Sequence, residues 1–347
     1  MTEHNLEAFL PKKEGYVVAV VGATGAVGQT MLEILQERKF PISKIIPVAS
    51  SRSAGSLIEF NDESYEVEDL DGFDPEGVDI ALFSAGGGTS KQHAPRFAEA
   101  GCYVIDNSSA WRMNEDIGLL VPEVNPNDLE MARHNRIIAN PNCSTIQMVV
   151  ALNPLHAVVP IKRVNVSTYQ AVSGGGGKAI EELAKQTASL LNGETAKVNV
   201  FPARIAFNVI PHIDVFLENG YTKEEQKMID ETVKIMHADI AVTATTVRVP
   251  VFYGHSEAVN ITFEDEMTAD HARQILADAE GICVIDDPAS EDYPLASDAA
   301  GTDPVWVGRI REDASCANSL HLWVVADNIR KGAALNAIQI AELLIAQ

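Results

Sequence analysis

Apolar runs alternate with amphipathic segments along the first part of the chain. YVVAVVG (16–22) is continuously apolar, which is typical of a central parallel strand that is covered on both faces. In the segment that follows, Val27, Met31, Leu32 and Leu35 share one helical face. Further strands are expected at 45–50, 78–86, 102–108 and 136–140, with a helix near 89–100. This order predicts an α/β fold with a Rossmann-like, doubly wound first domain.

The pattern changes after about residue 144. Polar and apolar positions alternate in five segments, at 162–172, 245–251, 256–264, 305–311 and 319–327. Helices are expected at 178–191, 222–237 and 268–279, and an Ala-rich amphipathic segment, 328–347, ends the chain. Such alternation is typical of antiparallel strands with one covered face. We expect two domains: residues 1–143 completed by the C-terminal helix 328–347, and residues 144–327, an α+β domain with a mostly antiparallel sheet.

Length, charge and cysteine content narrow the class of protein. The 347 residues suffice for two domains, each with its own core. The formal net charge of -23 argues against nucleic acid or an anionic membrane as a partner. The four cysteines are scattered without a C-x-x-C pair, so we expect no disulfides, no metal site and a reducing compartment. We see neither a signal peptide nor a stretch of roughly 18 apolar residues, and we expect a cytoplasmic protein.

A glycine-rich turn follows the first predicted strand. In VVGATGAVGQ, Gly22, Gly25 and Gly28 stand between a strand and a helix, where glycine permits a tight turn and close approach of a pyrophosphate. The G-x-x-G-x-x-G spacing is only moderately specific, and a turn that needs glycine for packing is the alternative. The strand–turn–helix context favours a dinucleotide site. Its residues are expected to be Gly22, Thr24, Gly25, Ala26, Val27 and Gly28.

The end of the second predicted strand indicates which dinucleotide binds. NAD sites place an acidic residue there for the ribose 2′-hydroxyl, whereas NADP needs a cation for its 2′-phosphate. This chain has Ser51, Arg52 and Ser53 at that point, and the first acidic residue after them is Glu59. An arginine can bind the phosphate through two hydrogen bonds. The sequence therefore favours NADP.

Cys143 lies in NPNCST (140–145), after a strand-like run and before residues that start helices well. The positive end of a helix lowers the pKa of a thiol and populates the nucleophilic thiolate. Beside a nicotinamide, a thiolate can add to an aldehyde, and the thiohemiacetal can give up hydride and become a thioester. The alternative is a buried structural cysteine. The motif alone does not decide between a catalytic nucleophile and a structural cysteine.

Taken together, the motifs resemble those of the aspartate-semialdehyde dehydrogenase family. They run in order along almost the whole chain: GATGAVG, ASSRSAG, DNSSAWR, VPEVN, NPNCST, TYQAVSG, FNVIPHID, RVPVFYGHSEAV, VGRIRED and DNIRKGAALNA. The resemblance implies reversible conversion of L-aspartate 4-semialdehyde, phosphate and NADP⁺ to L-4-aspartyl phosphate and NADPH. It also implies a role in the biosynthesis of lysine through diaminopimelate, of methionine and of threonine. An NADP-binding first domain, a catalytic and dimerisation second domain, and a homodimer, with dimers of dimers left open, are implied as well.

The same resemblance gives roles to individual residues. Cys143 is implied to carry the acyl thioester, His255 to be the general acid and base, and Gln170 to position the substrate. Arg248 is implied to bind the substrate carboxylate. Arg248 and His255 are seven residues apart, so one continuous strand would send their side chains to opposite faces. A turn near 253–254 must therefore redirect His255.

Further residues are implied to bind phosphate and cofactor. Arg112 and Lys227 match the phosphate-binding cations, although each by itself is more simply a surface charge. Ser173, Gly174 and Asn328 match cofactor contacts, with Asn328 near the nicotinamide carboxamide.

Two other functions remain open. The nearer is an acyl-phosphate reductase like N-acetyl-gamma-glutamyl-phosphate reductase, which shares the cysteine and histidine but lacks the RVPVFYGHSEAV and EEQKM context. The other is a non-catalytic dinucleotide-binding paralogue. Such a protein would have lost its nucleophile, whereas this chain keeps Cys143, Gln170, Arg248 and His255 together.

Overall fold

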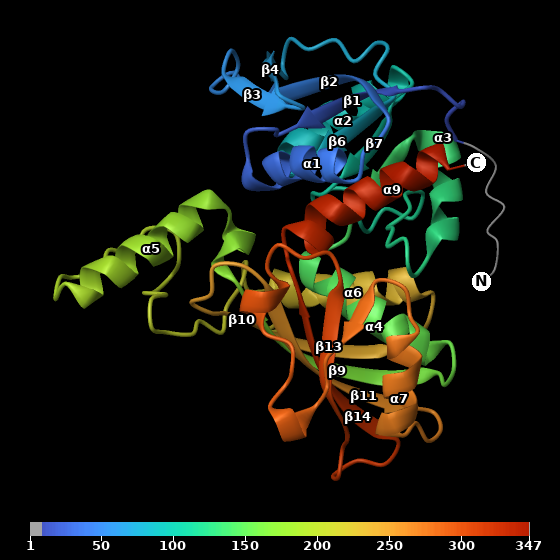
Figure 1. The fold of residues 1–347 in the computed structure, drawn as a ribbon, viewed down its shortest axis with the longest axis vertical. Coiled ribbons are helices and arrows are strands. Elements are labelled where there is room, and N and C mark those ends of the chain that lie inside the picture. The colour runs from blue at the N-terminus through green and yellow to red at the C-terminus, as the bar shows by residue number, and fades with distance from the viewer. Residues whose placement is uncertain (1–8, 347) are drawn as a thin grey trace. The chain divides into compact units, whose positions relative to one another are not determined.

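The computed structural model describes residues 9–346. The chain divides into two compact units, which are described separately (Figure 1). Unit 1 comprises Met1–Asn142 and Ala333–Gln347, and unit 2 comprises Cys143–Gly332. The chain thus passes from one unit to the other immediately before Cys143.

Unit 1 is built on a parallel sheet of six strands in the order β5-β2-β1-β6-β7-β8. The strands are β1 (Tyr16–Val21), β2 (Ile42–Ala49), β5 (Glu68–Asp69), β6 (Ile80–Phe83), β7 (Tyr103–Asp106) and β8 (Ile137–Ala139). The apolar run of β1 is buried because this strand lies inside the sheet. The chain adds β2 on one side of β1 and then returns to add β6 on the other. The predicted doubly wound fold is confirmed, and such folds bind ligands where the strand order reverses.

Helices of unit 1 come from both ends of the chain. They are α1 (Ala26–Glu37), α2 (Gly87–Glu99), α3 (Ala132–Asn135), which follows the 3₁₀ turn η1 (Pro126–Met131), and α9 (Leu335–Ile345). Met31 and Leu35 of α1 share one apolar core with Leu335 and Ile338 of α9. Helix α9 begins later than the predicted residue 328. The Asp327 carboxylate accepts hydrogen bonds from the N–H groups of the next residues, and a π-helical turn, η4 (Arg330–Ala334), precedes α9.

A hairpin in unit 1 was not predicted. Its strands are β3 (Leu57–Phe60) and β4 (Glu63–Glu66), which pair antiparallel. Asn61 and Asp62 form the two-residue turn with φ angles of 49° and 62°. Both residue types tolerate this left-handed conformation, which a two-residue turn of type I′ requires at both positions. Asn-Asp is a turn signal that the sequence contains. The hairpin was missed because the strands on either side of it are short and mostly polar.

Unit 2 holds a mixed sheet of six strands in the order β10-β9-β11-β14-β13-β12. The strands are β9 (Ile161–Gln170), β10 (Ala241–Arg248), β11 (His255–Phe263), β12 (Ile282–Val284), β13 (Val305–Glu312) and β14 (Ser319–Ala326). The three inner pairings are antiparallel, as predicted. The two outer pairings, of β10 with β9 and of β12 with β13, are parallel and were not foreseen.

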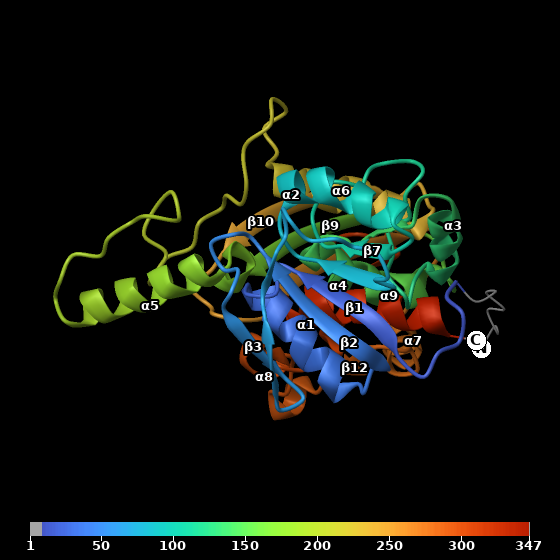
Figure 2. The same cartoon turned by 90° about the horizontal axis from the view of Figure 1, so that it is seen from above.

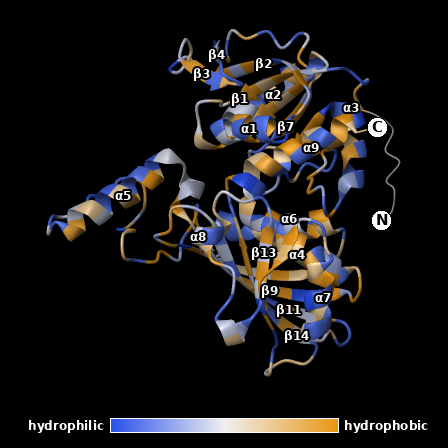
Figure 3. Ribbon diagram, viewed as in Figure 1, coloured by the Kyte–Doolittle hydropathy of each residue, from blue (hydrophilic) through white to orange (hydrophobic). Residues whose placement is uncertain are grey.

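Helices cover one face of the unit 2 sheet. They are α4 (Cys143–His156), α6 (Lys223–Met236) and α7 (Ala269–Ala277) (Figure 1). Beneath them lie the apolar positions of the alternating strands, such as Val164, Val166 and Val259, and hydrophobic residues concentrate on the strands of both sheets (Figure 3). The remaining short elements are η2 (Val172–Gly175), η3 (Pro288–Ser290) and α8 (Ala296–Ala299). Helix α5 (Gly177–Leu191) extends away from the sheet in both views (Figures 1 and 2).

Within residues 9–346, no helix combines the length and the apolar character that crossing a membrane requires.

Candidate active site

Three residues singled out from the sequence lie side by side at the ends of neighbouring strands. Arg248, the last residue of β10, pairs with Gln170, the last residue of β9. Ser256 of β11 pairs with Tyr169, so His255, the first residue of β11, comes beside Gln170. We call Gln170, Arg248 and His255 the strand-end row. All three side chains are buried on the face that the helices cover.

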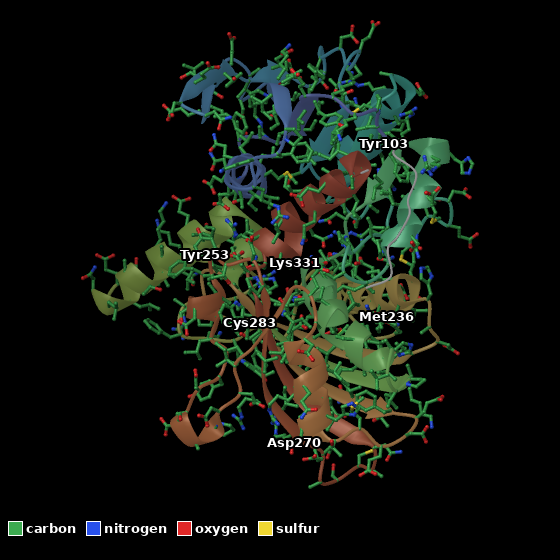
Figure 4. The ribbon with its side chains drawn as sticks, turned by 45° about the vertical axis from the view of Figure 1, so that its right-hand side comes forward. Tyr103, Met236, Tyr253, Asp270, Cys283 and Lys331 are labelled. Carbon is green, nitrogen blue, oxygen red and sulfur yellow. The ribbon has the colours of Figure 1, made fainter. Side chains whose placement is uncertain are left out.

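A turn between β10 and β11 brings His255 onto this face. It spans residues 249–254, and Tyr253, labelled in Figure 4, lies within it. Gly254 has a φ of 87°, and a Cβ atom there would come within 2.7 Å of the Ala296 carbonyl oxygen. Only glycine fits such a position without strain. The turn that the spacing of Arg248 and His255 required is therefore present.

Cys143 is the first residue of α4 and is half-buried. The N-terminus of a helix carries a positive partial charge, which stabilises negative charge on the sulfur. A Cβ atom on Gly332 would lie 2.8 Å from Cys143 Cβ, so the backbone after β14 passes directly against the cysteine. Burial lowers the pKa of Arg248, whereas Glu224 and Cys143 act to raise it. The thiol and the guanidinium are thus close enough to interact electrostatically.

The His255 ring has a defined hydrogen-bonding pattern. Its Nδ1 accepts a hydrogen bond of 3.0 Å from the Ala171 N–H, so a neutral ring carries its hydrogen on Nε2. Complete burial, and secondarily the charge of Arg248, hold the pKa of His255 well below its ordinary value. The imidazole is therefore neutral at neutral pH. Its Nε2 has no hydrogen-bond partner among the described residues.

The glycine-rich segment after β9 packs against the strand-end row. A Cβ atom on Gly174 would lie 3.0 Å from Arg248 Nη1 and 3.4 Å from His255 Nε2, so a side chain there would crowd both groups. Asn328, just after β14, accepts a 3.0 Å hydrogen bond from the Gly254 N–H and donates a 2.9 Å bond to Ser173 Oγ. The three predicted cofactor residues of unit 2 thus lie beside the row. Lys331, labelled in Figure 4, marks the segment that follows Asn328.

A buried carboxylate that the sequence did not point out completes this group. Glu224 of α6 accepts hydrogen bonds from Gln170 Nε2 at 3.3 Å and from Lys227 Nζ at 3.1 Å. Gln170 also donates to Ser144 Oγ at 2.6 Å, and Lys227 donates to Asp214 at 2.9 Å. Burial opposes the charge of Lys227, but the two carboxylates prevail and raise its pKa. The sequence did contain one sign of this pairing, because Glu224 and Lys227 are three residues apart on a predicted helix and such residues are neighbours on its surface.

In unit 1 the glycine-rich loop fits an anion. Gly22 has a φ of 90°, and a Cβ atom on Gly28 would lie 2.2 Å from the Gly22 carbonyl oxygen. Helix α1 begins at Ala26 with Gly25 as its N-cap, without a side-chain cap and without an acidic residue in its first turn. The N–H groups at this end are therefore available for a pyrophosphate.

The predicted 2′-phosphate residues lie beside this loop. Thr24 Oγ1 donates a 3.4 Å hydrogen bond to Ser53 Oγ, which joins the glycine-rich loop to the segment after β2. Ser51 and Arg52 are exposed to solvent. Residues 51–53 thus present a cation and hydroxyl groups beside the loop, and this combination fits a phosphate.

Arg112 is not the surface charge that its residue type suggests. It is buried in unit 1, where Nε donates to the Asn140 carbonyl at 2.9 Å and Nη2 to the Asn107 carbonyl at 2.7 Å. These bonds hold the guanidinium against the segment that leads from β8 to Cys143. Lys227 is also largely shielded, with 20% of its side chain exposed. The surface interpretation is wrong for Arg112.

Comparison with known proteins identifies the family. Residues 17–132 match the family model described as semialdehyde dehydrogenase, NAD binding domain, and residues 152–331 match semialdehyde dehydrogenase, dimerisation domain. An aspartate-semialdehyde dehydrogenase of Aquifex aeolicus is 57% identical over 334 residues, which cover 95% of this chain and 98% of the relative. The chain belongs to the aspartate-semialdehyde dehydrogenase family. The resemblance seen in the sequence is confirmed.

Solved structures of the aspartate-semialdehyde dehydrogenase family share the fold. The Vibrio cholerae aspartate semialdehyde dehydrogenase II complexed with ASA has a TM-score of 0.94 and 52% identity, and the match covers 96% of this chain and 99% of that one. The Candida albicans enzyme with NADP has a TM-score of 0.74 and 26% identity, with coverage of 96% and 99%. These names favour aspartate-semialdehyde dehydrogenase over the N-acetyl-gamma-glutamyl-phosphate reductase alternative.

Proposed function

We propose that this chain catalyses the reversible, NADP-dependent conversion of L-aspartate 4-semialdehyde and phosphate to L-4-aspartyl phosphate and NADPH. The observation that carries the proposal is the position of Cys143 at the start of α4, where the next residue, Ser144, accepts a 2.6 Å hydrogen bond from Gln170 of the strand-end row. The reaction would supply the biosynthesis of lysine through diaminopimelate, and of methionine and threonine.

A turnover assay tests this function. NADPH absorbance is followed with L-aspartate 4-semialdehyde, phosphate and NADP⁺, and with each component left out in turn. We expect steady turnover only when all three are present. The matched substrate is N-acetyl-L-glutamate 5-semialdehyde, which lacks a free ammonium group and is one methylene longer. Faster turnover of that compound would contradict the proposal.

Cys143 supplies the nucleophile. Its thiolate adds to the aldehyde carbon: the C–S bond forms, the C=O π bond opens, and the negatively charged oxygen takes up a proton to become the hydroxyl of a thiohemiacetal. NADP⁺ would supply the hydride acceptor for this carbon when bound, and the hydroxyl proton must leave to a base in the same step. The resulting thioester on Cys143 is attacked by a phosphate oxygen, the C–S bond breaks and the thiolate is restored. The helix N-terminus and the nearby Arg248 both stabilise the thiolate at the start and end of the cycle.

His255 acts on the substrate oxygen. In the tautomer that the Ala171 hydrogen bond favours, Nε2–H can donate a hydrogen bond to the oxygen of the tetrahedral adduct and stabilise its negative charge. This geometry supports the proton-donor half of the acid–base role. For the base half, Nε2 must offer its lone pair, so Nδ1 must carry the proton and release the Ala171 N–H. The exchange between these two states stays a prediction.

Arg248 and Glu224 match the two charges of an amino-acid substrate. The buried guanidinium of Arg248 can bind the α-carboxylate through two parallel hydrogen bonds. Glu224 is a buried carboxylate whose charge acts on Arg248, and it can bind the α-ammonium group. Gln170, which donates to Glu224 and to Ser144 beside Cys143, positions the reacting end of the substrate. Opposite charges at fixed positions orient the aldehyde toward the thiolate.

The cofactor residues are divided between the two units. In unit 1, the segment from Gly22 to Gly28 would hold the pyrophosphate, and Ser51, Arg52 and Ser53 the 2′-phosphate. In unit 2, Ser173, Gly174 and Asn328 would contact the nicotinamide end, since they adjoin His255.

Replacement of Arg52 tests the cofactor preference. We expect Arg52→Ala to weaken NADP binding by about ten- to a hundredfold and to change NAD binding little, because a charge-assisted hydrogen bond is worth roughly 1.5–3 kcal/mol. Dissociation constants from isothermal titration, measured for both cofactors, check this. Lys91→Ala, which removes another exposed cation of unit 1, is the control. Equal losses for NADP and NAD would refute the role of Arg52.

Replacement of Arg112 tests the phosphate site, which we propose to include Lys227 as well. Phosphate acts only after hydride transfer, so Arg112→Ala should raise KM for phosphate while thioester formation persists. Rapid mixing with NADP⁺ and semialdehyde, without phosphate, should still give a burst of about one NADPH per active site. A thermal unfolding curve like that of wild type is the control for the buried position. A variant that folds but gives no burst would contradict this division of roles.

Assembly and location complete the proposal. The family model that matches residues 152–331 carries the description dimerisation domain, and we infer a homodimer. Pairing of dimers into a tetramer remains part of the proposal. None of the four cysteines forms a disulfide, which fits a reducing compartment such as the cytoplasm.

A further inference from the structure

A second polar row lies directly below the strand-end row. It consists of Thr168, Thr246 and Glu257, which are two residues away from Gln170, Arg248 and His255 on the same strands. Thr246 and Glu257 both pair with Thr168. Because side chains alternate along a strand, both rows face the same helices. The next row, Val166, Ala244 and Val259, is apolar, so the second row separates the candidate active site from the core.

Helix α4 places Gln147 over this second row. Gln147 Nε2 donates a 3.3 Å hydrogen bond to the backbone carbonyl of His255. Its side chain also lies next to the Glu257 carboxyl group and acts on its pKa, although no hydrogen bond of ordinary length joins the two. Gln147, Thr168 and Glu257 have no measurable exposure to solvent. Gln147 is therefore the link between Glu257 and the residue that carries the imidazole.

Four buried polar atoms of this cluster have no hydrogen-bond partner among the described residues. They are Gln147 Oε1, Thr168 Oγ1 and both carboxyl oxygens of Glu257. If Glu257 is ionised, its two oxygens and Gln147 Oε1 can only accept. The donors of the cluster are then the Thr168 hydroxyl and the second N–H of Gln147 Nε2, since the first N–H bonds the His255 carbonyl. A proton on Glu257 creates an O–H group, which can donate a hydrogen bond to Gln147 Oε1. Protonation therefore adds a donor to a cluster whose unpartnered atoms are mostly acceptors.

Among the described residues, those that pair with Glu257 on the neighbouring strands or cover it from α4 include no cation. Its partners on the neighbouring strands are Thr168 of β9 and Val324 of β14, and α4 contributes the uncharged Gln147. On its own strand, His255 shares the face and is neutral. Burial raises the pKa of Glu257 well above its ordinary value, and the Gln147 amide opposes that shift only in part.

We propose that Glu257 is a positioning residue that stays protonated and fixes His255 through Gln147. The Glu257 O–H orients the Gln147 amide, and this amide holds the carbonyl of His255 at the start of β11. His255 is thus held by two hydrogen bonds. Gln147 donates to its backbone carbonyl, and the Ala171 N–H donates to Nδ1 of its ring. The role rests on the proposed function, because it concerns the part that His255 plays in that reaction.

Kinetics of matched variants test the proposal. Glu257→Gln keeps the shape, the neutrality and a donor, so its kcat should stay within about threefold of wild type. Glu257→Leu removes the donor, and its kcat should fall by about ten- to a hundredfold, because small misplacements of catalytic groups cost that much. KM for semialdehyde and for NADP⁺ should change less than about twofold in both variants. Asn260→Leu, a similar change on the opposite face of β11, is the control and should behave like wild type.

A second pair of measurements does not depend on Glu257→Leu folding. Gln147→Met, which removes the amide at similar volume, should lower kcat by about ten- to a hundredfold. The infrared difference spectrum of wild type minus Glu257→Gln should show the C=O stretch of a buried carboxylic acid. This band reports the protonation of Glu257 without any turnover.

The outcomes separate the two proposals. If wild type fails to turn over while the acid band is present, the proposed function is wrong and the protonation of Glu257 stands. An ionised carboxylate in the spectrum, a loss above tenfold in Glu257→Gln, or wild-type kcat in Gln147→Met would overturn the positioning role. A folded Glu257→Leu with wild-type kcat would also overturn it.

Discussion

Cys143→Ala is expected to lower kcat by at least about 10⁴-fold while the dissociation constant for NADP stays unchanged. Removal of a covalent nucleophile has costs of this order, because no other group can form the thioester. Cofactor binding should survive because the proposed NADP contacts come from other residues. Steady-state kinetics and isothermal titration, performed on the same preparations, check the two halves of this prediction.

A matched control is available in the same chain. Cys316 is exposed and lies in the turn before β14, so Cys316→Ala should keep wild-type kcat. Alkylation followed by intact-protein mass spectrometry should show one modification that NADP and substrate prevent in wild type and that disappears in Cys143→Ala. Turnover at the wild-type rate in Cys143→Ala would exclude the thioester mechanism.

His255→Asn is expected to lower kcat by about 10²- to 10⁴-fold with little change in stability. The asparagine Oδ1 can take the place of Nδ1 and keep the hydrogen bond from the Ala171 N–H, while the Nε2–H group is lost. The loss should therefore report the interaction of Nε2 with the substrate oxygen. Single-turnover kinetics with NADP⁺ and semialdehyde measure the affected step directly.

His156 provides the control for this substitution. Its Nδ1 accepts a 3.0 Å hydrogen bond from the Ile161 N–H, as His255 does from Ala171, but it lies in the last turn of α4, at the opposite end from Cys143. His156→Asn should therefore keep wild-type kcat. Equal losses in the two variants would show that the effect of His255→Asn is structural.

Several elements were predictable because local patterns determine them. The run of β1 is apolar on both faces because the strand is central, and the alternation in β9 and β11 matches the face that the helices cover. Helix α6 starts at Lys223 after Thr222, which forms a capping box with Glu225. The two parallel edge pairings of unit 2 could not be predicted from the sequence, because parallel and antiparallel edge strands have a similar alternation of polar and apolar residues.

The sequence by itself determined the local chemistry of this protein. The glycine-rich turn before α1, the cation at Arg52 and the thiol at the start of α4 each depend on residues that are close together in the chain. Helix dipoles and tight turns act over a few residues, so the residues that depend on them can be recognised in the sequence without knowledge of the fold. The roles of Gln170, Arg248 and His255 came only from family resemblance.

Only the tertiary structure decided how the site is assembled. Gln170 and Arg248 are 78 residues apart in the sequence, yet strand register makes them neighbours, and the turn at Gly254 adds His255. Register is set by burial of one whole sheet face, which no short segment encodes. For the same reason the sequence did not reveal that Glu224 accompanies Arg248 or that Glu257 lies below His255. Their burial and their partners come from strands and helices that meet only in the folded chain.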